Sequence, residues 1–225
     1  MRYIVTPEVT KHRIFVWAHK AVLPDCKLMV IARDDDTSFG ILHSHIHELW
    51  ALAMGSRHGV GNDPRYTPST TFETFPFPPG LTPNLPAASF ADDPRARRIA
   101  ESARALLEAR ERWLNPSELV QRVPEVLPGF PDRILPRNAA AAELLKRRTL
   151  TNLYNLRGTP EAAWLDNLHR TLDEAVAVAY GWPADLSDDG MLKRLLALNQ
   201  ARTATPGRER ALDGNAAAAA PMART

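Results

Sequence analysis

Residues 76–94, PFPPGLTPNLPAASFADDP, separate two parts of the chain that differ in pattern. Six prolines in this stretch fix backbone φ angles and remove amide donors, which is typical of a semi-extended connection. Short β-branched and aromatic runs precede it, and segments with helical periodicity follow it. We therefore expect an α+β protein, in which a small mixed α/β module is followed by an all-α helical module.

Two strands are predicted in the first part. The runs 13–18 (RIFVWA) and 28–32 (LMVIA) are short and rich in β-branched and aromatic residues, as strands are. After the second run, the acidic triplet at 34–36 predicts a turn. Residues 70–77 alternate polar and aromatic side chains and are predicted to form a third, short strand.

One helix is predicted in the first part, over residues 44–54. Its apolar side chains recur at helical spacing, at Ile46, Leu49, Trp50 and Ala53. Ser44 is a suitable N-cap, and Gly55 is a suitable end. The following residues, 55–71, have the composition of a loop.

Caps and helix breakers define four helices after the proline-rich stretch. Asp93-Pro94 begins a helix that extends to about residue 113. A proline-rich connection leads to a helix over 138–156, and further helices are predicted over 160–179 and 191–201. The expected boundaries are 1–78 for the first module, 79–94 for the linker, 95–202 for the helical module and 203–225 for a disordered tail.

Composition indicates a cytoplasmic protein that makes no contact with a membrane. The first residues lack a signal-peptide pattern, and no run approaches the roughly 20 apolar residues of a membrane span. The single cysteine, Cys26, excludes an internal disulfide and fits a reducing compartment. The 28 basic and 26 acidic residues give a net charge of only +2, so any nucleic-acid contact depends on a local patch.

Two sets of ordered motifs resemble a known family. The first set comprises Tyr3-Ile4, Lys11-His12-Arg13, Gly40-Ile41-Leu42-His43-Ser44, His47-Glu48-Leu49-Trp50, Pro64-Arg65-Tyr66-Thr67-Pro68 and Thr71-Phe72-Glu73-Thr74-Phe75-Pro76-Phe77-Pro78. It resembles the target-recognition domain of MmeI-like DNA methyltransferases, which are restriction-modification or phage-defence enzymes that methylate adenine. The second set comprises Thr149-Leu150-Thr151-Asn152-Leu153-Tyr154-Asn155, Leu168-His169, Tyr180-Gly181-Trp182-Pro183 and Leu195-Leu196-Ala197-Leu198-Asn199. It resembles the helical domain that follows in the same family.

The resemblance implies double-stranded DNA as partner and S-adenosylmethionine as cofactor of the full-length enzymes. The family's Gly-rich cofactor loop and its Asn-Pro-Pro-Tyr-type motif, which holds a flipped adenine, are absent from this sequence. Asn115-Pro116-Ser117 lacks the second proline and the aromatic residue. We therefore expect no cofactor and no catalytic residue in this chain, which would be a split subunit, a truncated product or a fragment.

The candidate DNA-binding site is the glycine-spaced segment after the first predicted helix. Arginine, asparagine and aspartate are the side chains that bind guanine, adenine and cytosine edges, and this segment concentrates them. The expected DNA-binding residues are Arg57, His58, Asn62, Asp63, Arg65 and Tyr66. The alternative is a solvated surface loop in which Arg65 interacts with Asp63.

Other candidates have structural interpretations. His43, His45, His47 and Glu48 suggest a metal site, but a helix start at Ser44 would break their alternation, so no metal is expected. The basic cluster 146–148 is either a phosphate contact or a solvated helix face.

An alternative function also follows from the sequence. The helical half would then be an interaction subunit that docks a separately encoded methyltransferase domain, or the chain would be a non-functional remnant.

Overall fold

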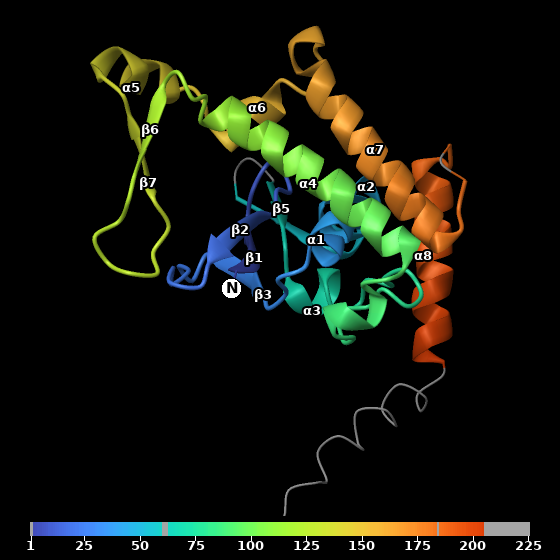
Figure 1. The fold of residues 1–225 in the computed structure, drawn as a ribbon. Helices are drawn as coiled ribbons and strands as arrows, with labels where there is room; N and C mark the ends of the chain where they lie inside the picture. The colour runs from blue at the N-terminus through green and yellow to red at the C-terminus, as the bar shows by residue number, and fades with distance from the viewer. Residues whose placement is uncertain (1, 60–62, 184, 205–225) are drawn as a thin grey trace, which may run out of the picture.

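The computed structural model describes residues 2–59, 63–183 and 185–204 (Figure 1). Within them, antiparallel sheets are formed by β1 (Arg2–Pro7), β2 (Val16–His19), β3 (Leu28–Ile31), β4 (Ser56–His58), β5 (Asp63–Arg65), β6 (Val120–Val123) and β7 (Arg133–Pro136). The α-helices are α1 (Asp36–His43), α2 (His45–Met54), α3 (Pro68–Thr71), α4 (Pro94–Leu114), α5 (Ala139–Leu145), α6 (Leu150–Asn155), α7 (Ala163–Tyr180) and α8 (Asp188–Thr203). Two 3-10 turns, η1 (Ala87–Phe90) and η2 (Pro160–Ala162), complete the elements. This content confirms the predicted α+β class.

The main sheet has the strand order β2-β1-β3, with β1 antiparallel to both neighbours. Ile4 of β1 lies between Trp17 of β2 and Ile31 of β3 in this register. The two strands predicted at 13–18 and 28–32 are confirmed, with the first shifted toward the C-terminus. The central strand β1 is absent from the prediction, because its middle residues are buried on both faces and give no alternating pattern.

Helix α1 replaces the turn predicted at residues 34–36. The carboxylate of Asp35 accepts a hydrogen bond from the amide of Ser38 at 2.7 Å, so the acidic triplet caps a helix. Nearly every residue of α1 is buried, which removes the polar face that would have revealed a helix. Gly40 allows the close approach of α4, since a Cβ there would lie 2.6 Å from Ile99 Cγ2.

Helix α2 is confirmed with its predicted ends. Its N-cap is Ser44, whose side chain accepts from the amide of His47, and its C-cap is Gly55. The predicted loop after it is wrong in part, because β4 and β5 form a hairpin there. The predicted strand at 70–77 is also wrong, since Pro68 begins the one-turn helix α3 and turns follow it.

The predicted linker packs against the core instead of bridging solvent. Leu81 and Phe90 are buried, and Arg33 donates to the carbonyl oxygens of Pro83 and Leu85 at 3.1 and 2.7 Å. Buried residues from both sides of this segment belong to one continuous hydrophobic cluster. The division into modules at 1–78 and 95–202 therefore stays a prediction.

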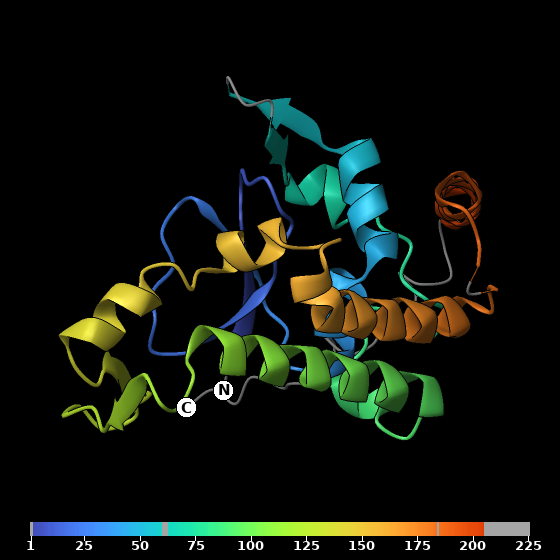
Figure 2. The same cartoon turned by 90° about the horizontal axis from the view of Figure 1, so that it is seen from above.

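Helices α4 and α7 pack side by side, and both contact α1 (Figures 1 and 2). As predicted, Asp93 caps α4, Pro94 occupies its first turn, and Gly181 ends α7 in the left-handed conformation with a φ of 72°. The single helix predicted over 138–156 is two helices, because Thr149 caps α6 and so interrupts the pattern.

The proline-rich connection before α5 contains a second hairpin, β6–β7, that no sequence signal indicated. It extends from the end of α4 as an arm, with α5 beside it (Figure 1). Helix α8 extends to Thr203, and the rest of the predicted tail, from residue 205, lies outside the described residues. Within the described ranges, no helix combines the length and the apolar character that crossing a membrane requires.

Candidate nucleic-acid interface

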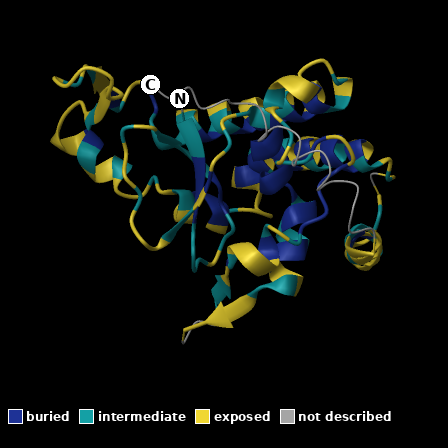
Figure 3. Cartoon of the chain, turned by 90° about the horizontal axis from the view of Figure 1, so that it is seen from below, coloured by how far each residue is buried: buried dark blue, intermediate teal, exposed yellow. Residues whose placement is uncertain are grey.

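The predicted DNA-binding segment forms a protruding hairpin. In β4–β5, Arg57 pairs with Pro64 and His58 pairs with Asp63, and the strand β4 is exposed along its length. Figures 2 and 3 show the hairpin projecting from the body, with most of its surface open to solvent. Gly59 continues the chain into the tip with a φ of 79°, a conformation that favours glycine. Asn62, also predicted to bind DNA, lies outside the described residues.

The base of the hairpin is bound to the segment that follows β1. The amide of Tyr66 donates to the carbonyl of Glu8 at 2.7 Å, and the amide of Thr10 donates to that of Pro64 at 3.3 Å. Arg65 adds an ion pair with Glu8 at 2.6 Å, and the side chain of Arg65 stays 45% exposed. An exposed strand above a base that is held by several contacts is an arrangement that loops with binding functions commonly have.

Tyr66 belongs to the core and not to the exposed site. Its ring is 1% exposed, its hydroxyl lies 3.0 Å from His47 Nε2, and the guanidinium of Arg13 covers the ring at 4.9 Å. Burial raises the pKa of the phenol. The sequence prediction of DNA contact by Tyr66 is therefore corrected: the side chain fixes the base of the hairpin, and its ring is not accessible to a duplex.

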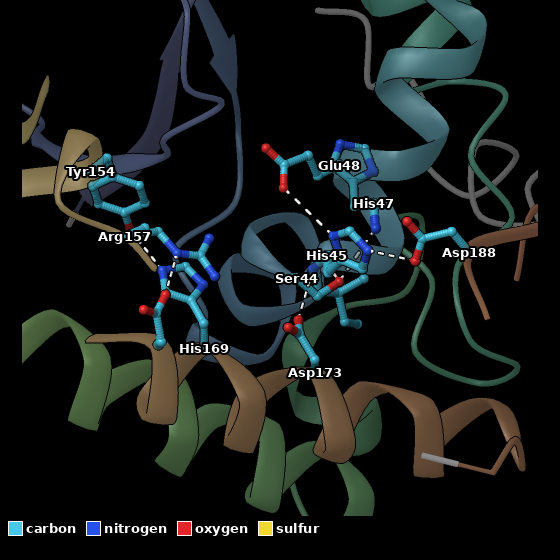
Figure 4. A network of polar contacts seen from close by, with 11 residues as sticks. Ser44, His45, His47, Glu48, Tyr154, Arg157, His169, Asp173 and Asp188 are labelled. Atoms are coloured by element: carbon cyan, nitrogen blue, oxygen red, sulfur yellow. Dashed lines mark hydrogen bonds and ion pairs between the residues drawn. The ribbon is translucent and has the colours of Figure 1, made fainter. Parts of the chain in front are cut away.

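The histidines near the start of α2 do not converge on one centre. His43 and His47 are buried in the core, whereas His45 faces Asp188 of α8 at 3.0 Å (Figure 4). The nearby carboxylates of Glu48, at 3.7 Å, and Asp188, at 3.0 Å, raise the pKa of His45 to about 9, against the opposing effect of burial. In the described part of the chain, no group of three or more potential ligands could hold a metal ion. His45 therefore joins α2 to α8 electrostatically.

A buried polar chain links α1, α6 and α7. The amide of Phe15 donates to His43 Nδ1 at 3.2 Å, and Arg110 Nη1 lies 3.1 Å from Nε2 of the same ring. That nitrogen lies 2.9 Å from the hydroxyl of Tyr154, which lies 3.0 Å from His169 Nε2. Burial, and next to it the charge of Arg110, lowers the pKa of His43, and burial lowers that of His169 to about 3.

All three side chains of the polar chain are buried, and the lowered pKa values keep both imidazoles neutral near pH 7. The polar chain therefore holds α1, α6 and α7 in position relative to one another. Its members are separated by 111 and 15 residues in sequence. Two of the motifs that carry the family resemblance, Leu168-His169 and the one that ends in Tyr154-Asn155, contribute to this polar chain. No sequence signal indicates that they contact His43.

The remaining candidates are at the surface. In the basic cluster, Lys146 forms an ion pair with Glu143 at 2.6 Å, and Arg148 donates to the carbonyl of Trp113 at 2.6 Å. Both contacts are local, which fits a solvated helix face better than a dedicated phosphate site. Cys26 is exposed.

Comparison with known proteins gives one structural match. No family model matches the chain, and no curated protein matches its sequence. Among solved structures, the Type IIL restriction-modification enzyme MmeI in complex with DNA is similar, with a TM-score of 0.57 and 19% sequence identity. The match covers 91% of this chain and 22% of the solved chain, so this chain spans about a fifth of that enzyme's length. At this level of identity, the match shows a shared fold.

Proposed function

We propose that this chain supplies DNA recognition to a restriction-modification system, and that the hairpin β4–β5 is the element that contacts the duplex. The observation that carries the proposal is the exposed hairpin with a fixed base, within a fold shared with a restriction-modification enzyme bound to DNA. The motif resemblance to MmeI-like methyltransferases is an independent reason for the same family.

The side chains of the hairpin suit both phosphate and base-edge contacts. Arg57 and Arg65 carry guanidinium groups that bind guanine or phosphate in a bidentate manner, and Asp63 accepts from cytosine. The ion pair with Glu8 orients the guanidinium of Arg65, while the side chain as a whole stays 45% exposed. His58 and, from the sequence alone, Asn62 complete the proposed set.

The proposed role assigns methylation to a domain outside the described fold. A catalytic domain with S-adenosylmethionine, in the same polypeptide or separately encoded, would modify adenine at the site that this chain recognises. Recognition of genomic DNA by such a system is a cytoplasmic function.

A second candidate function is protein docking, which the arm β6–β7 favours. The loop between its strands exposes large apolar side chains, with Val126 84%, Leu127 60% and Phe130 45% exposed. Exposed apolar groups that cluster on a projecting element are typical of protein contact sites. In this alternative the chain is a docking subunit for a methyltransferase and binds no DNA itself.

Selection from a random duplex pool tests the proposal. The full chain should retain DNA that shares a short motif, and retention should weaken as salt rises. Arg57→Ala and Arg65→Ala should each lower affinity by about 5- to 150-fold and relax the motif at one position. Unchanged affinity in both variants, or no retention by the unmodified chain, would reject recognition by the hairpin and favour docking.

A further inference from the structure

A polar pocket of about 470 Å³ lies next to the base of the hairpin β4–β5, since Arg13 of its lining donates to the carbonyl of Pro64 at 3.1 Å. Its walls come from both halves of the chain. The turn before β2 contributes Lys11, His12 and Arg13, and the end of α6 with the loop after it contributes Asn155 and Arg157. Tyr154 and His169 of the buried polar chain form its inner wall, and Figure 4 shows these two side chains next to Arg157.

Two donors converge on a single oxygen at this pocket. The ammonium of Lys11 donates to Asn155 Oδ1 at 2.7 Å, and His12 Nε2 lies 2.8 Å from the same atom. Within the described residues, Lys11 forms no ion pair with a carboxylate, so its full charge faces the pocket. An anionic oxygen in the position of Asn155 Oδ1 would accept from the same two donors and would also neutralise the charge of the Lys11 ammonium.

The two carboxylates that line the pocket are already engaged. Asp166 accepts from Arg157 at 2.9 Å and from the amide of Gly158 at 2.8 Å. Glu48 lies 3.7 Å from His45, whose pKa of about 9 keeps it protonated at neutral pH. Arg13 is held by the carbonyl oxygens of Pro7 and Pro64 and interacts with the charge of Glu48, so within the described residues Lys11 is the cation of the pocket that has no carboxylate partner.

The pocket lies close enough to the hairpin for one duplex to contact both. Arg65 pairs with Glu8, and Lys11 lies three positions after Glu8 in the sequence. Three residues of extended chain span at most about 10 Å, which is the length of roughly three base-pair steps of 3.4 Å. A DNA strand held at the hairpin would therefore pass the pocket within the same turn of the double helix.

We propose that the pocket between Lys11, His12 and Asn155 binds a backbone phosphate of double-stranded DNA, next to the groove that the hairpin contacts. This inference rests on the proposed function and adds a contact that is independent of base sequence. A phosphate held across the two halves of the chain fixes the register of the hairpin on the duplex. The amide oxygen of Asn155 occupies the phosphate position in the free protein.

Fluorescence anisotropy with a labelled duplex, measured on the full chain at several salt concentrations, tests the pocket. Lys11→Gln removes the charge. Asn155→Asp changes an exposed residue and puts a carboxylate against Lys11, so that the fold should be retained. Each variant should bind DNA about 3- to 10-fold more weakly, and the salt dependence should lose about one phosphate contact, a slope change of roughly 0.9. The selected sequence motif should stay the same.

Lys193→Gln, at an exposed lysine of α8, is the matched control and should leave the affinity and the slope unchanged. If Lys11→Gln and Asn155→Asp bind like the unmodified chain while Arg65→Ala does not, the phosphate pocket is wrong and recognition by the hairpin stands. If the unmodified chain binds no duplex at any salt concentration, both proposals fail. Saturable binding of inorganic phosphate that depends on Lys11, with unchanged DNA affinity, would assign the pocket to a free anion and overturn the proposal.

Discussion

Replacing Gly40 with alanine perturbs the point where α1, α4 and α7 meet. A Cβ at this position would lie 2.6 Å from Ile99 Cγ2, 3.2 Å from Ala103 Cβ and 3.2 Å from Leu172 Cδ1. Ile99 is fully buried and β-branched, so its side chain has little freedom to rotate away. The new methyl group therefore has to separate α1 from its two neighbours.

The expected loss of stability is the difference between two effects. Overpacking of a dense core costs about 1–3 kcal/mol, and a contact as short as that with Ile99 belongs to the upper part of this range. Exchange of glycine for alanine within a helix gains about 1 kcal/mol. We expect a net loss of about 1–2 kcal/mol, which lowers the melting temperature of a chain of this size by roughly 2–8 °C.

Urea and thermal unfolding followed by circular dichroism measure this loss. Gly190→Ala on α8 is the control, because its Cβ would meet the side chain of Leu186, which can move, and the hydrogen bond from the residue 190 amide to Ser187 is kept. This variant should be as stable as the unmodified chain or slightly more stable. A Gly40→Ala variant that gains stability as the control does would refute the packing described for α1.

The same experiment tests whether the two predicted modules unfold together. Gly40 lies in the first module, whereas Ile99 and Leu172 lie in the second, and the hydrophobic cluster is continuous between them. A single transition, shifted as a whole by Gly40→Ala, is expected for such a core. Two separate transitions, only one of them shifted, would instead support independent modules at 1–78 and 95–202.

Three other outcomes follow from particular contacts. The protonated His45 stabilises the fold fully below its unfolded pKa of about 6.5, and this contribution is lost as pH rises through the folded pKa of about 9. His45→Gln removes the contribution, which is small because the ion pair with Asp188 is partly exposed. In urea titrations, the unmodified chain should exceed the variant in free energy of unfolding by about 1 kcal/mol near pH 6.5 and by nothing near pH 9.5. Tyr66→Phe leaves His47 Nε2 buried without its 3.0 Å partner, so unfolding assays should show a loss of about 1–3 kcal/mol, while DNA affinity at a temperature where the variant is folded should not change. The exposed thiol of Cys26 should react with a maleimide in the native chain at nearly the rate measured in denaturant, and slow reaction would contradict its exposure.

Local signals were sufficient for elements whose ends carry a cap. Ser44 and Gly55 delimit α2, and Asp93-Pro94 begins α4, because these residues satisfy backbone groups within a few residues of themselves. Helix α1 also carries a cap, Asp35, but it is buried on nearly all sides and therefore lacks helical periodicity in its sequence. From the sequence alone, its acidic triplet predicts a turn.

The hairpins depended on pairing that no local pattern encodes. Strand β5 is three residues long and contains Pro64, which has no amide to donate to a partner strand. It is held by contacts with residues 8–10, more than fifty positions earlier in the sequence. The composition of the segment could indicate a candidate DNA contact, but its conformation followed only from tertiary structure.

Substitutions at the exposed strand of the hairpin and at its packed base should have different effects. Arg57 and His58 lie on the exposed strand β4, so in the proposed interface substitutions there would change base contacts with little effect on the core. Tyr66 and Arg13 at the base are packed against each other and against the core, so their replacement would move the hairpin as a whole. The phosphate pocket joins this same base to α6 through Lys11 and Asn155, and it makes no base contact. If the proposed interface is correct, such a fold would change its DNA sequence preference through the exposed strand while its position on the DNA backbone stayed constant.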